Sequence, residues 1–315
     1  MKQKLAILFL LIAVSTGSTR CWAQPPVLSS SEAQAAVDEM GQLVEKHFFD
    51  PKLKGLDWPN LVLQTRQTVA AQPQKLDEQA NRLLGQLQSS HTRYFPCDAQ
   101  GFHELCGVFG SMGFFPQLQK RAPYHGAGWF LYPTPQGTFI KNVWPGFAAE
   151  KAGLRVGDLL LDIDGQPPTS LAALGKDSVA VRFRRTAQGP VETVQLQPEQ
   201  LDPMEAFLEA QRRSAKVERT PQGRIGYVAM RCYAGDQFQE LLESQLQKEP
   251  LRDCDALILD LRDGWGGASP QYLDIFSPQR PFLQLVDRNG KRQTFGSAWR
   301  RPVAFLINGG TTSGK

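Results

Sequence analysis

Residues 255–267 read DALILDLRDGWGG, and this stretch decides the fold of the second half of the chain. Its first part, Asp255 to Arg262, is a nearly continuous apolar run, which is typical of a strand buried in a parallel sheet. A glycine-rich turn, Asp263 to Gly267, follows at once. The stretch therefore predicts an α/β core in which a buried strand carries a polar turn at its carboxyl end.

The sequence before this stretch supplies the other elements of such a core. An apolar strand is predicted at 225–230, and the helix after it places Phe238 and Leu242 on one face. Because strand, helix and strand follow one another within about 35 residues, they predict a right-handed crossover between parallel strands. A charged amphipathic helix is predicted at 204–216, ahead of this unit.

A further apolar strand is predicted at 302–307, after a hairpin turn at Asn289-Gly290. It also ends in a glycine-rich turn, residues 308–314, which read NGGTTSG. Neighbouring parallel strands have their carboxyl ends at one edge of the sheet, where α/β proteins place their sites. We therefore expect the turns at 263–267 and 308–314 to lie close together.

Short strands and turns fill the chain from about residue 114 to residue 198. Residues 142–165 read NVWPGFAAEKAGLRVGDLLLDIDG. This order of a Pro-Gly turn, a small-residue pair, Ala-Gly-Leu, Gly-Asp and Asp-Gly resembles the pattern of bacterial PDZ domains. Apolar strands are predicted at 129–131, 138–143, 159–163, 179–184 and 191–196. The resemblance implies a small β-barrel with short helices.

A PDZ module binds an extended peptide beside an open strand edge, and N–H groups of a glycine-containing loop bind the terminal carboxylate. The candidate loop consists of Gly126, Ala127, Gly128, Trp129 and Phe130. Its two aromatic residues either line a pocket for the last side chain of the peptide or fill the core of the barrel. Because side chains alternate along a strand, we expect only one of them to point toward the peptide.

Residues 29–88 are predicted to be helical. Ser31 is the expected N-cap of the first helix, and a second amphipathic helix begins after Pro73. The apolar faces carry Ala36, Met40, Leu43 and Val44 in the first helix and Leu76, Leu83, Leu84 and Leu87 in the second. No residue pattern in this region indicates chemistry, so we expect simple helix packing.

The first 23 residues have the three-part plan of a secretory signal peptide. A cationic start, Met1 to Lys4, precedes the apolar run Leu5 to Val14 and a small-residue tail that ends at Ala23. As a helix the apolar run would rise only about 15 Å, half the thickness of the bilayer core. We expect cleavage after Ala23 and a protein exported to the periplasm or the cell exterior, without a stable membrane anchor.

Composition and charge exclude several classes of protein. With 41% hydrophobic and 21% charged residues, the chain is neither of low complexity nor intrinsically disordered. The formal net charge of +4 falls to +1 once the three basic residues of the expected signal peptide are removed. This balance gives no overall attraction to nucleic acid.

Four cysteines remain after the signal peptide, in an exported setting that permits disulfides. Cys97 and Cys106 are candidates for a local bridge, whereas Cys232 and Cys254 lie in apolar stretches and are expected to be buried thiols. The spacing from His103 to Cys106 suits no compact zinc site. No metal or organic cofactor is expected.

The order of these motifs resembles the carboxy-terminal processing (tail-specific) serine peptidases. The resemblance rests on Asp260-Leu261-Arg262, on Gly266-Gly267 and on the strand that leads into Ser313, all behind a PDZ module. Residues 91–95, HTRYF, also resemble the segment before the PDZ module in that family. The implied organisation is a signal peptide at 1–23, a helical segment at 24–105, a PDZ-like domain at 106–200 and an α/β peptidase core at 201–315 that is incomplete at its C-terminus.

The resemblance also implies the site residues. Ser313 matches the nucleophile, on a tight turn after the last apolar strand and at the start of the following helix. The amide of Gly314 and one from Gly266 or Gly267 would donate to the oxyanion. The implied partners are protein or peptide substrates, bound through their C-terminal tails by the PDZ module.

Two departures from the family pattern concern catalysis. Thr311, Thr312, Gly314 and Lys315 surround Ser313, where the family more often has small residues and a serine. The family's general base is a lysine about two dozen residues beyond the serine, and this sequence stops two residues beyond it. Lys315 would lie about 200° around the helix from Ser313, on the wrong side. We therefore expect the 315-residue polypeptide alone to have little or no peptidase activity.

Two other hypotheses belong to different classes of protein. Gly309, Gly314 and Lys315 fit the first seven positions of a phosphate-binding P-loop, whose next residue would be a serine or threonine. The other hypothesis is a non-catalytic adaptor that uses the PDZ groove and retains a peptidase scaffold.

Overall fold

The structure is a computed structural model that describes residues 28–111, 113, 122–248, 250–277, 279, 283–295 and 298–314. The predicted signal peptide and Lys315 lie outside these residues. Two compact units are present: one includes the described residues up to His103 and residues 170–172, and the other includes the remainder. Within the described part of the chain, no helix has both the length and the hydrophobicity needed to cross a membrane.

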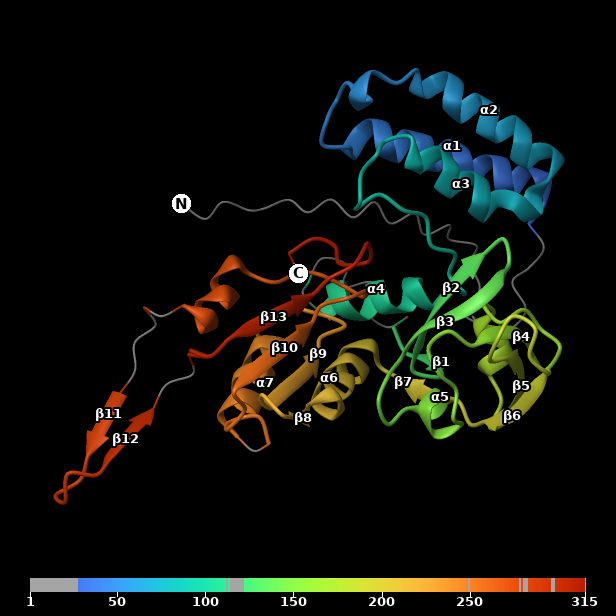
Figure 1. The fold of residues 1–315 in the computed structure, drawn as a ribbon. Coiled ribbons are helices and arrows are strands. Elements are labelled where there is room, and N and C mark those ends of the chain that lie inside the picture. Colours follow the sequence, from blue (N-terminus) through green and yellow to red (C-terminus); the bar gives the residue numbers. More distant parts are fainter. Residues whose placement is uncertain are drawn as a thin grey trace. The chain divides into compact units, whose positions relative to one another are not determined.

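The first unit is a helical bundle, as predicted. Helices α1 (Ser30–His47), α2 (Trp58–Ala71) and α3 (Leu76–Gly85) pack side by side, with 3-10 turns at Leu53–Gly55 and Pro73–Lys75 (Figure 1). Its core includes buried Val37, Met40, Val44, Trp58, Val69, Leu76, Leu83 and Leu84. These are the apolar positions that recur at helical spacing in the sequence.

The N-cap of α1 is Ser29, and the prediction of Ser31 was wrong. The Ser29 hydroxyl accepts the Glu32 N–H at 3.2 Å, and the Ser29 N–H donates to the Glu32 carboxylate at 2.8 Å. A capping box takes a glutamate or glutamine three residues after the cap, so both Ser29-Glu32 and Ser31-Gln34 fit the pattern. In the structure Glu32 bonds Ser29, whereas the Gln34 amide donates to the carbonyl and the hydroxyl of Ser30.

The PDZ-like region is an antiparallel sheet with the strand order β2-β3-β4-β5-β6. Its strands are β2 (Trp129–Thr134), β3 (Gly137–Val143), β4 (Leu159–Ile163), β5 (Val179–Arg184) and β6 (Glu192–Leu196). All five predicted strands are confirmed, and α5 (Ala148–Lys151) is one of the short helices that the PDZ resemblance implied. Strand β2 lies at one edge of the sheet, where a peptide could add as a further strand.

Two short strands complete the region around this sheet. Strand β1 (Tyr124–Gly126) pairs antiparallel with β7 (Glu199–Leu201), so the start and the end of the PDZ-like region are joined. A 3-10 segment at Leu171–Leu174 and helix α4 (Gln100–Ser111) are the remaining elements before the core.

The α/β core is a sheet with the order β13-β10-β9-β8. Strands β9 (Gly223–Ala229), β10 (Ala256–Asp260) and β13 (Val303–Leu306) run parallel, and β8 (Lys216–Thr220) joins β9 as an antiparallel edge. Helix α7 (Asp236–Gln247) makes the predicted crossover from β9 to β10. Helices α6 (Pro203–Ser214) and α7 lie side by side against the sheet (Figure 1). The α/β prediction is confirmed for this part of the chain.

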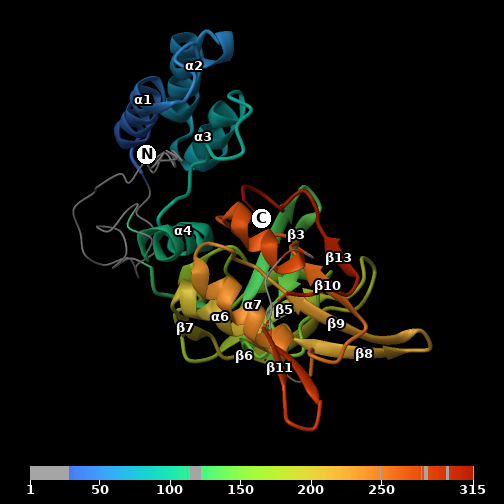
Figure 2. The same ribbon diagram turned by 90° about the vertical axis from the view of Figure 1, so that its left-hand side faces the viewer.

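The segment between β10 and β13 contains a 3-10 helix and a hairpin. The 3-10 helix covers Pro270–Phe276, and β11 (Leu283–Val286) pairs antiparallel with β12 (Arg292–Phe295). The predicted Asn289-Gly290 turn joins these two strands. Figure 2 shows the hairpin extending away from the rest of its unit.

The four cysteines of the described chain are present as thiols. Cys106, Cys232 and Cys254 are buried, as expected for the last two, while Cys97 is exposed. The candidate bridge between Cys97 and Cys106 is therefore not formed in this structure.

Replacing Leu259 by alanine will destabilise the α/β core. Leu259 lies on the central strand β10 and is 1% exposed, so truncation loses apolar burial and leaves a cavity that costs about 2–5 kcal/mol. Urea unfolding followed by circular dichroism measures the loss. The control is Leu273→Ala, at a side chain 63% exposed, which should change stability by less than about 0.5 kcal/mol. Equal losses in the two variants would contradict the assigned packing.

Candidate active site

The site lies where β10 and β13 end. The Leu261 N–H donates to the Leu306 carbonyl at 2.9 Å, which continues the parallel pairing one residue past β10. Residues 261–268, here called the β10 turn, and residues 307–314, the β13 turn, then leave the sheet at the same edge. This is the arrangement that the two glycine-rich turns predicted.

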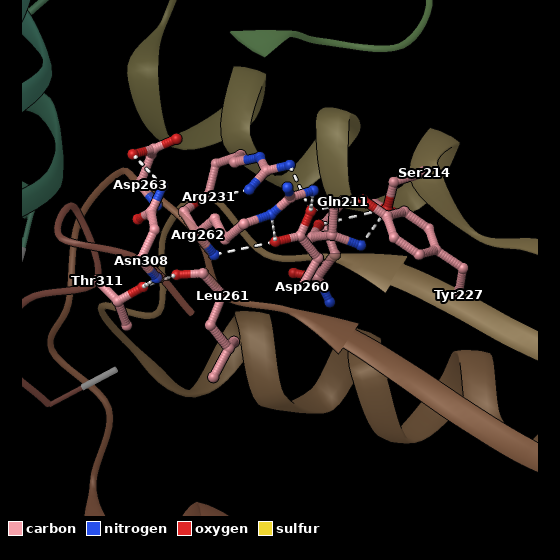
Figure 3. Close-up of polar contacts among 11 residues, drawn as sticks. Gln211, Ser214, Tyr227, Arg231, Asp260, Leu261, Arg262, Asp263, Asn308 and Thr311 are labelled. Atoms are coloured by element: carbon pink, nitrogen blue, oxygen red, sulfur yellow. Dashed lines mark hydrogen bonds and ion pairs between the residues drawn. The ribbon is translucent and has the colours of Figure 1, made fainter. Parts of the chain in front are cut away.

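Polar side chains bind the two turns to each other (Figure 3). The Asp263 N–H donates to the Asn308 amide oxygen at 3.2 Å, and the Asn308 amide nitrogen donates to the Asp263 carboxylate at 3.0 Å. The Thr311 hydroxyl donates to the Leu261 carbonyl at 2.9 Å. Because these hydrogen bonds join side chains and backbone groups of both turns, they fix the position of one turn relative to the other.

Gly266 lies directly against Ser313. A Cβ atom at position 266 would lie 2.7 Å from the Ser313 Cβ and would also collide with the Thr312 carbonyl. Beside this contact, the Ala268 N–H donates to the Gly314 carbonyl at 2.8 Å. Ser313 itself is exposed. The structure therefore brings Ser313, Gly314 and Gly266 together, and only a glycine permits the approach at 266.

Gly267 is placed differently from Gly266. A Cβ atom at position 267 would meet Ala234, at a distance of 2.8 Å from its Cα and Cβ atoms. Gly267 thus packs against the segment that follows β9, whereas Gly266 packs against the candidate nucleophile. Of the two sequence candidates for an oxyanion donor in this turn, Gly266 is the one in contact with Ser313.

The segment after β9 forms backbone hydrogen bonds with the β10 turn. The Trp265 N–H donates to the Arg231 carbonyl at 2.8 Å, and the Tyr233 N–H donates to the Trp265 carbonyl at 3.0 Å. The Trp265 indole N–H donates to the Glu104 carboxylate at 2.9 Å, and its ring packs edge-on against Phe109 at 5.9 Å. Trp265 is therefore anchored through its backbone on the segment after β9 and through its side chain on helix α4.

A buried carboxylate fixes the last residue of β10. Asp260 is fully buried and pairs with Arg231 at 3.0 Å and Arg262 at 2.8 Å, while the Tyr227 hydroxyl donates to it at 2.6 Å (Figure 3). Arg231 also donates to the Arg262 carbonyl, and the Arg262 N–H donates back to Asp260 at 3.0 Å. This network holds the backbone at the point where the strand becomes the β10 turn.

The network lowers the pKa of Asp260. Burial by itself would raise that pKa, but hydrogen bonds from Arg262, the charge of Arg231 and hydrogen bonds from Tyr227 and Arg231 outweigh it. The pKa of the Asp260 carboxyl therefore lies well below its usual range. In return, the bond to Asp260 raises the pKa of Arg262, so the pair stays charged at all physiological pH values.

Ser313 lies on a turn, as predicted, and has a φ of +59°, in the left-handed region. The prediction that a helix follows this turn concerns residues after the described chain and stays a prediction. Lys315 lies outside the described residues, so its predicted position on the wrong side of the helix is not tested.

The hydrogen bonds of the β13 turn bear on the P-loop hypothesis. The Asn308 N–H donates to the Thr311 hydroxyl, the Gly310 N–H to the Asn308 side chain and the Thr311 N–H to the Asn308 carbonyl, at 2.9–3.1 Å. A P-loop needs such N–H groups to point at phosphate. Here these three are used within the turn, which disfavours the P-loop.

The candidate tail-binding loop is held by backbone bonds. The Trp144 N–H donates to the Gly128 carbonyl at 2.7 Å, and the Ala149 N–H donates to the Ala127 carbonyl at 2.8 Å. Gly128 has a φ of +74°, and a Cβ atom there would collide with the Phe147 side chain. Gly128 is therefore required both by its backbone conformation and by the close approach.

The two aromatic residues of this loop have different surroundings. Trp129 is 1% exposed and fills the core, which was one of its two predicted roles. Phe130 is half-buried, and its ring packs against Trp144 at 5.4 Å and Phe207 of α6 at 6.2 Å. Phe130 thus joins the PDZ-like sheet to the α/β core.

Sequence reasoning missed several residues that build this site. Asn308, Arg231 and Glu104 are each brought to the β10 turn from another element. A signal for Asn308 existed, because an asparagine at the end of an apolar strand often bonds a nearby backbone. Among the described residues, no group of three or more histidine, cysteine, aspartate or glutamate side chains is placed to hold a metal ion.

Two regions of the chain match known families. Residues 224–315 match Peptidase family S41, and residues 139–176 match the PDZ domain. These regions coincide with the α/β core that carries both turns and with the middle of the PDZ-like sheet. The chain therefore has a region that matches Peptidase family S41 behind a region that matches a PDZ domain, as the sequence resemblance predicted.

Individual relatives are distant. The chain is 21% identical over 173 residues to the carboxy-terminal processing protease CtpB of Bacillus subtilis, covering 51% of this chain and 34% of CtpB. It is 25% identical over 265 residues to a tricorn protease homolog of Streptomyces coelicolor, covering 76% of this chain and 21% of the relative. Thus it spans about a third or less of these curated relatives.

A solved structure also resembles the chain. The photosystem II D1 C-terminal processing protease shares 18% sequence identity with it, over 89% of this chain and 76% of that protein, at a TM-score of 0.48.

Replacing Asp260 by asparagine will destabilise the protein in a pH-dependent way. Removing one partner of this buried network leaves Arg231 without its carboxylate, at a cost of about 3 kcal/mol at pH 7. The carboxyl pKa is about 3.9 in the unfolded chain and lower in the folded one. The stabilisation is therefore complete above about pH 5 and is lost as the pH falls through the folded-state pKa.

Urea unfolding of both proteins at several pH values measures this difference. Below about pH 4 the gap between wild type and Asp260→Asn should narrow by about 1.4 kcal/mol per pH unit. A gap that is constant from pH 7 to pH 3 would show that the charge of Asp260 does not stabilise the fold.

Replacing Gly266 by alanine will separate the two turns. The new methyl group would collide with Ser313 and Thr312, so the hydrogen bond from Ala268 to Gly314 should weaken and the amide of Ala268 should exchange faster with solvent. Hydrogen-exchange mass spectrometry measures this rate. Gly309→Ala is the control, because a Cβ atom there has open space around it. Unchanged exchange at Ala268 in Gly266→Ala would refute the contact.

Proposed function

We propose that this chain is part of an exported serine endopeptidase of the carboxy-terminal processing type. Its PDZ module would bind the C-terminal tail of a protein substrate, and Ser313 would act as the nucleophile. The observation that carries the proposal is the contact of Gly266 with Ser313 at the carboxyl ends of two parallel strands, within a region of peptidase family S41. Membership of that family supports serine chemistry at this position.

The proposed chemistry is acyl transfer through Ser313. The Ser313 Oγ attacks the carbon of the scissile carbonyl, its proton passes to a general base, and the carbonyl oxygen becomes an oxyanion. The amides of Gly266 and Gly314 are the proposed donors to that oxyanion. The C–N bond then breaks, the amine leaves with the proton, and water hydrolyses the ester. The general base is assigned to a lysine beyond residue 315, as the family resemblance implies.

Substrate selection is assigned to the PDZ module. The open edge of β2 would pair with an extended tail, and the N–H groups of the loop at residues 126–130 would bind its carboxylate. Because Trp129 is buried in the core, the loop backbone rather than that indole would make the contact with the tail. Export rests on the signal-peptide pattern of the first 23 residues.

Covalent labelling tests the nucleophile. The complete gene product, treated with a fluorophosphonate probe, should be labelled at Ser313, and Ser313→Ala should reduce labelling by at least about a hundred-fold because the acylated oxygen is gone. Peptide mapping by mass spectrometry locates the label. Ser178→Ala is the control, because its hydroxyl bonds Gln195 in the PDZ-like sheet and should leave labelling unchanged.

Tail binding separates the peptidase from a non-catalytic adaptor. A peptide with a free, apolar C-terminal residue should bind at least about ten-fold more tightly than its amidated form, because the amide removes the charge that the loop binds. Fluorescence anisotropy measures both affinities. Carboxylate-dependent binding without labelling of Ser313 would favour the adaptor, and loss of both would refute the proposal.

A further inference from the structure

Lys141 connects the PDZ-like sheet to the β10 turn. It lies on β3, next to the edge strand β2, and its Nζ is 2.6 Å from the Asp263 Oδ1. The Asp263 side chain is 9% exposed and that of Lys141 is 35% exposed. The Lys141 ammonium also lies over the Tyr132 ring of β2, 5.3 Å from its centre. The lysine therefore contacts the candidate tail-binding strand and the candidate active site at once.

Asp263 combines a left-handed backbone conformation with bonds to the other turn. It has a φ of +61°, in the left-handed region, which aspartate adopts more readily than most residues but which remains uncommon outside glycine. Its N–H and its carboxylate both bond Asn308 of the β13 turn, and Gly264 to Gly266 follow it directly. A change in the position of the Asp263 side chain would therefore move both turns.

The strength of this ion pair depends on its partial burial. Exposed ion pairs contribute little, because water and salt screen them. Asp263 is mostly removed from water, and a carboxylate in that state needs a charged or hydrogen-bonding partner. Asn308 supplies the hydrogen bond, and Lys141 supplies the positive charge from a different domain.

We propose that Lys141 is a positioning residue for the reaction at Ser313. By holding the Asp263 carboxylate, it keeps the β10 turn in the register that brings Gly266 against Ser313. The α/β core thus depends on the PDZ-like sheet for the geometry of its oxyanion donors, in addition to any binding of substrate tails. This inference rests on the proposed function and assigns a role to a residue outside the peptidase core.

The rate of labelling of Ser313 tests the inference. In the complete gene product, Lys141→Met should lower the maximal rate of fluorophosphonate labelling about ten-fold and change the probe concentration for half-maximal rate by less than about two-fold, since acylation and not probe binding needs the oxyanion donors. Lys141→Arg keeps the charge and should restore the rate to within about three-fold of wild type.

Hydrogen exchange provides the second measurement. Amides of residues 263–268 should exchange at least about five-fold faster in Lys141→Met, while those of β5 and β6 stay unchanged. The matched control is Lys176→Met, because Lys176 also forms a 2.6 Å ion pair, with Asp164, inside the PDZ-like region. It should affect neither the labelling rate nor the exchange of residues 263–268.

The outcomes separate the two proposals. Absence of labelling in the wild-type protein would overturn the proposed function itself. Normal wild-type labelling, with the same maximal rate in Lys141→Met, would overturn the positioning role alone. An equal loss in Lys176→Met, or no recovery in Lys141→Arg, would also overturn it, because either result would indicate a general loss of stability.

Discussion

The parallel pairing of β10 with β13 is the constraint on which the rest of the site depends. Strands that run in the same direction end at the same edge, so the two turns that follow them must meet. Once they meet, two hydrogen bonds between Asp263 and Asn308 fix the position of one turn relative to the other. The closeness of Gly266 to Ser313 follows from that register, because no side chain at 266 separates the turns.

The buried and paired Asp260 carboxylate at the end of β10 holds this edge of the sheet in place. Asp260 is fully buried, and two guanidinium groups and a phenol satisfy its oxygens. Such a group is costly to leave unpaired, so the network tolerates only small movements of Arg231 and Arg262. Since Arg231 also supports Trp265 through its carbonyl, the same residue holds the strand end and the turn.

The PDZ-like region and the α/β core pack against each other. Phe130 and Trp144 pack on Phe207 of α6, and Arg213 of α6 donates to the Gly146 carbonyl at 2.8 Å. Lys141 adds a charged contact at the β10 turn. A region of peptidase family S41 is thus built against its PDZ domain through aromatic packing, a hydrogen bond and an ion pair, all from residues close to the candidate functional loops.

The sequence by itself determined the local elements and their order. The continuous apolar runs, the Asn-Gly hairpin and the crossover spacing identified β9, α7, β10 and β13, because period and turn residues report local backbone preference. Topology rules then placed the two turns at one edge. The cap of α1 was not decided in this way, because Ser29 and Ser31 are each followed three residues later by a glutamate or a glutamine.

Only the tertiary structure decided which distant groups complete the site. Arg231, Lys141 and Glu104 lie about 30 to 160 residues from their partners in the sequence, and no local pattern encodes such pairs. The left-handed φ of Ser313 belongs to the same class, because isolated serine disfavours it. Packing and burial, which depend on the whole unit at once, select these contacts.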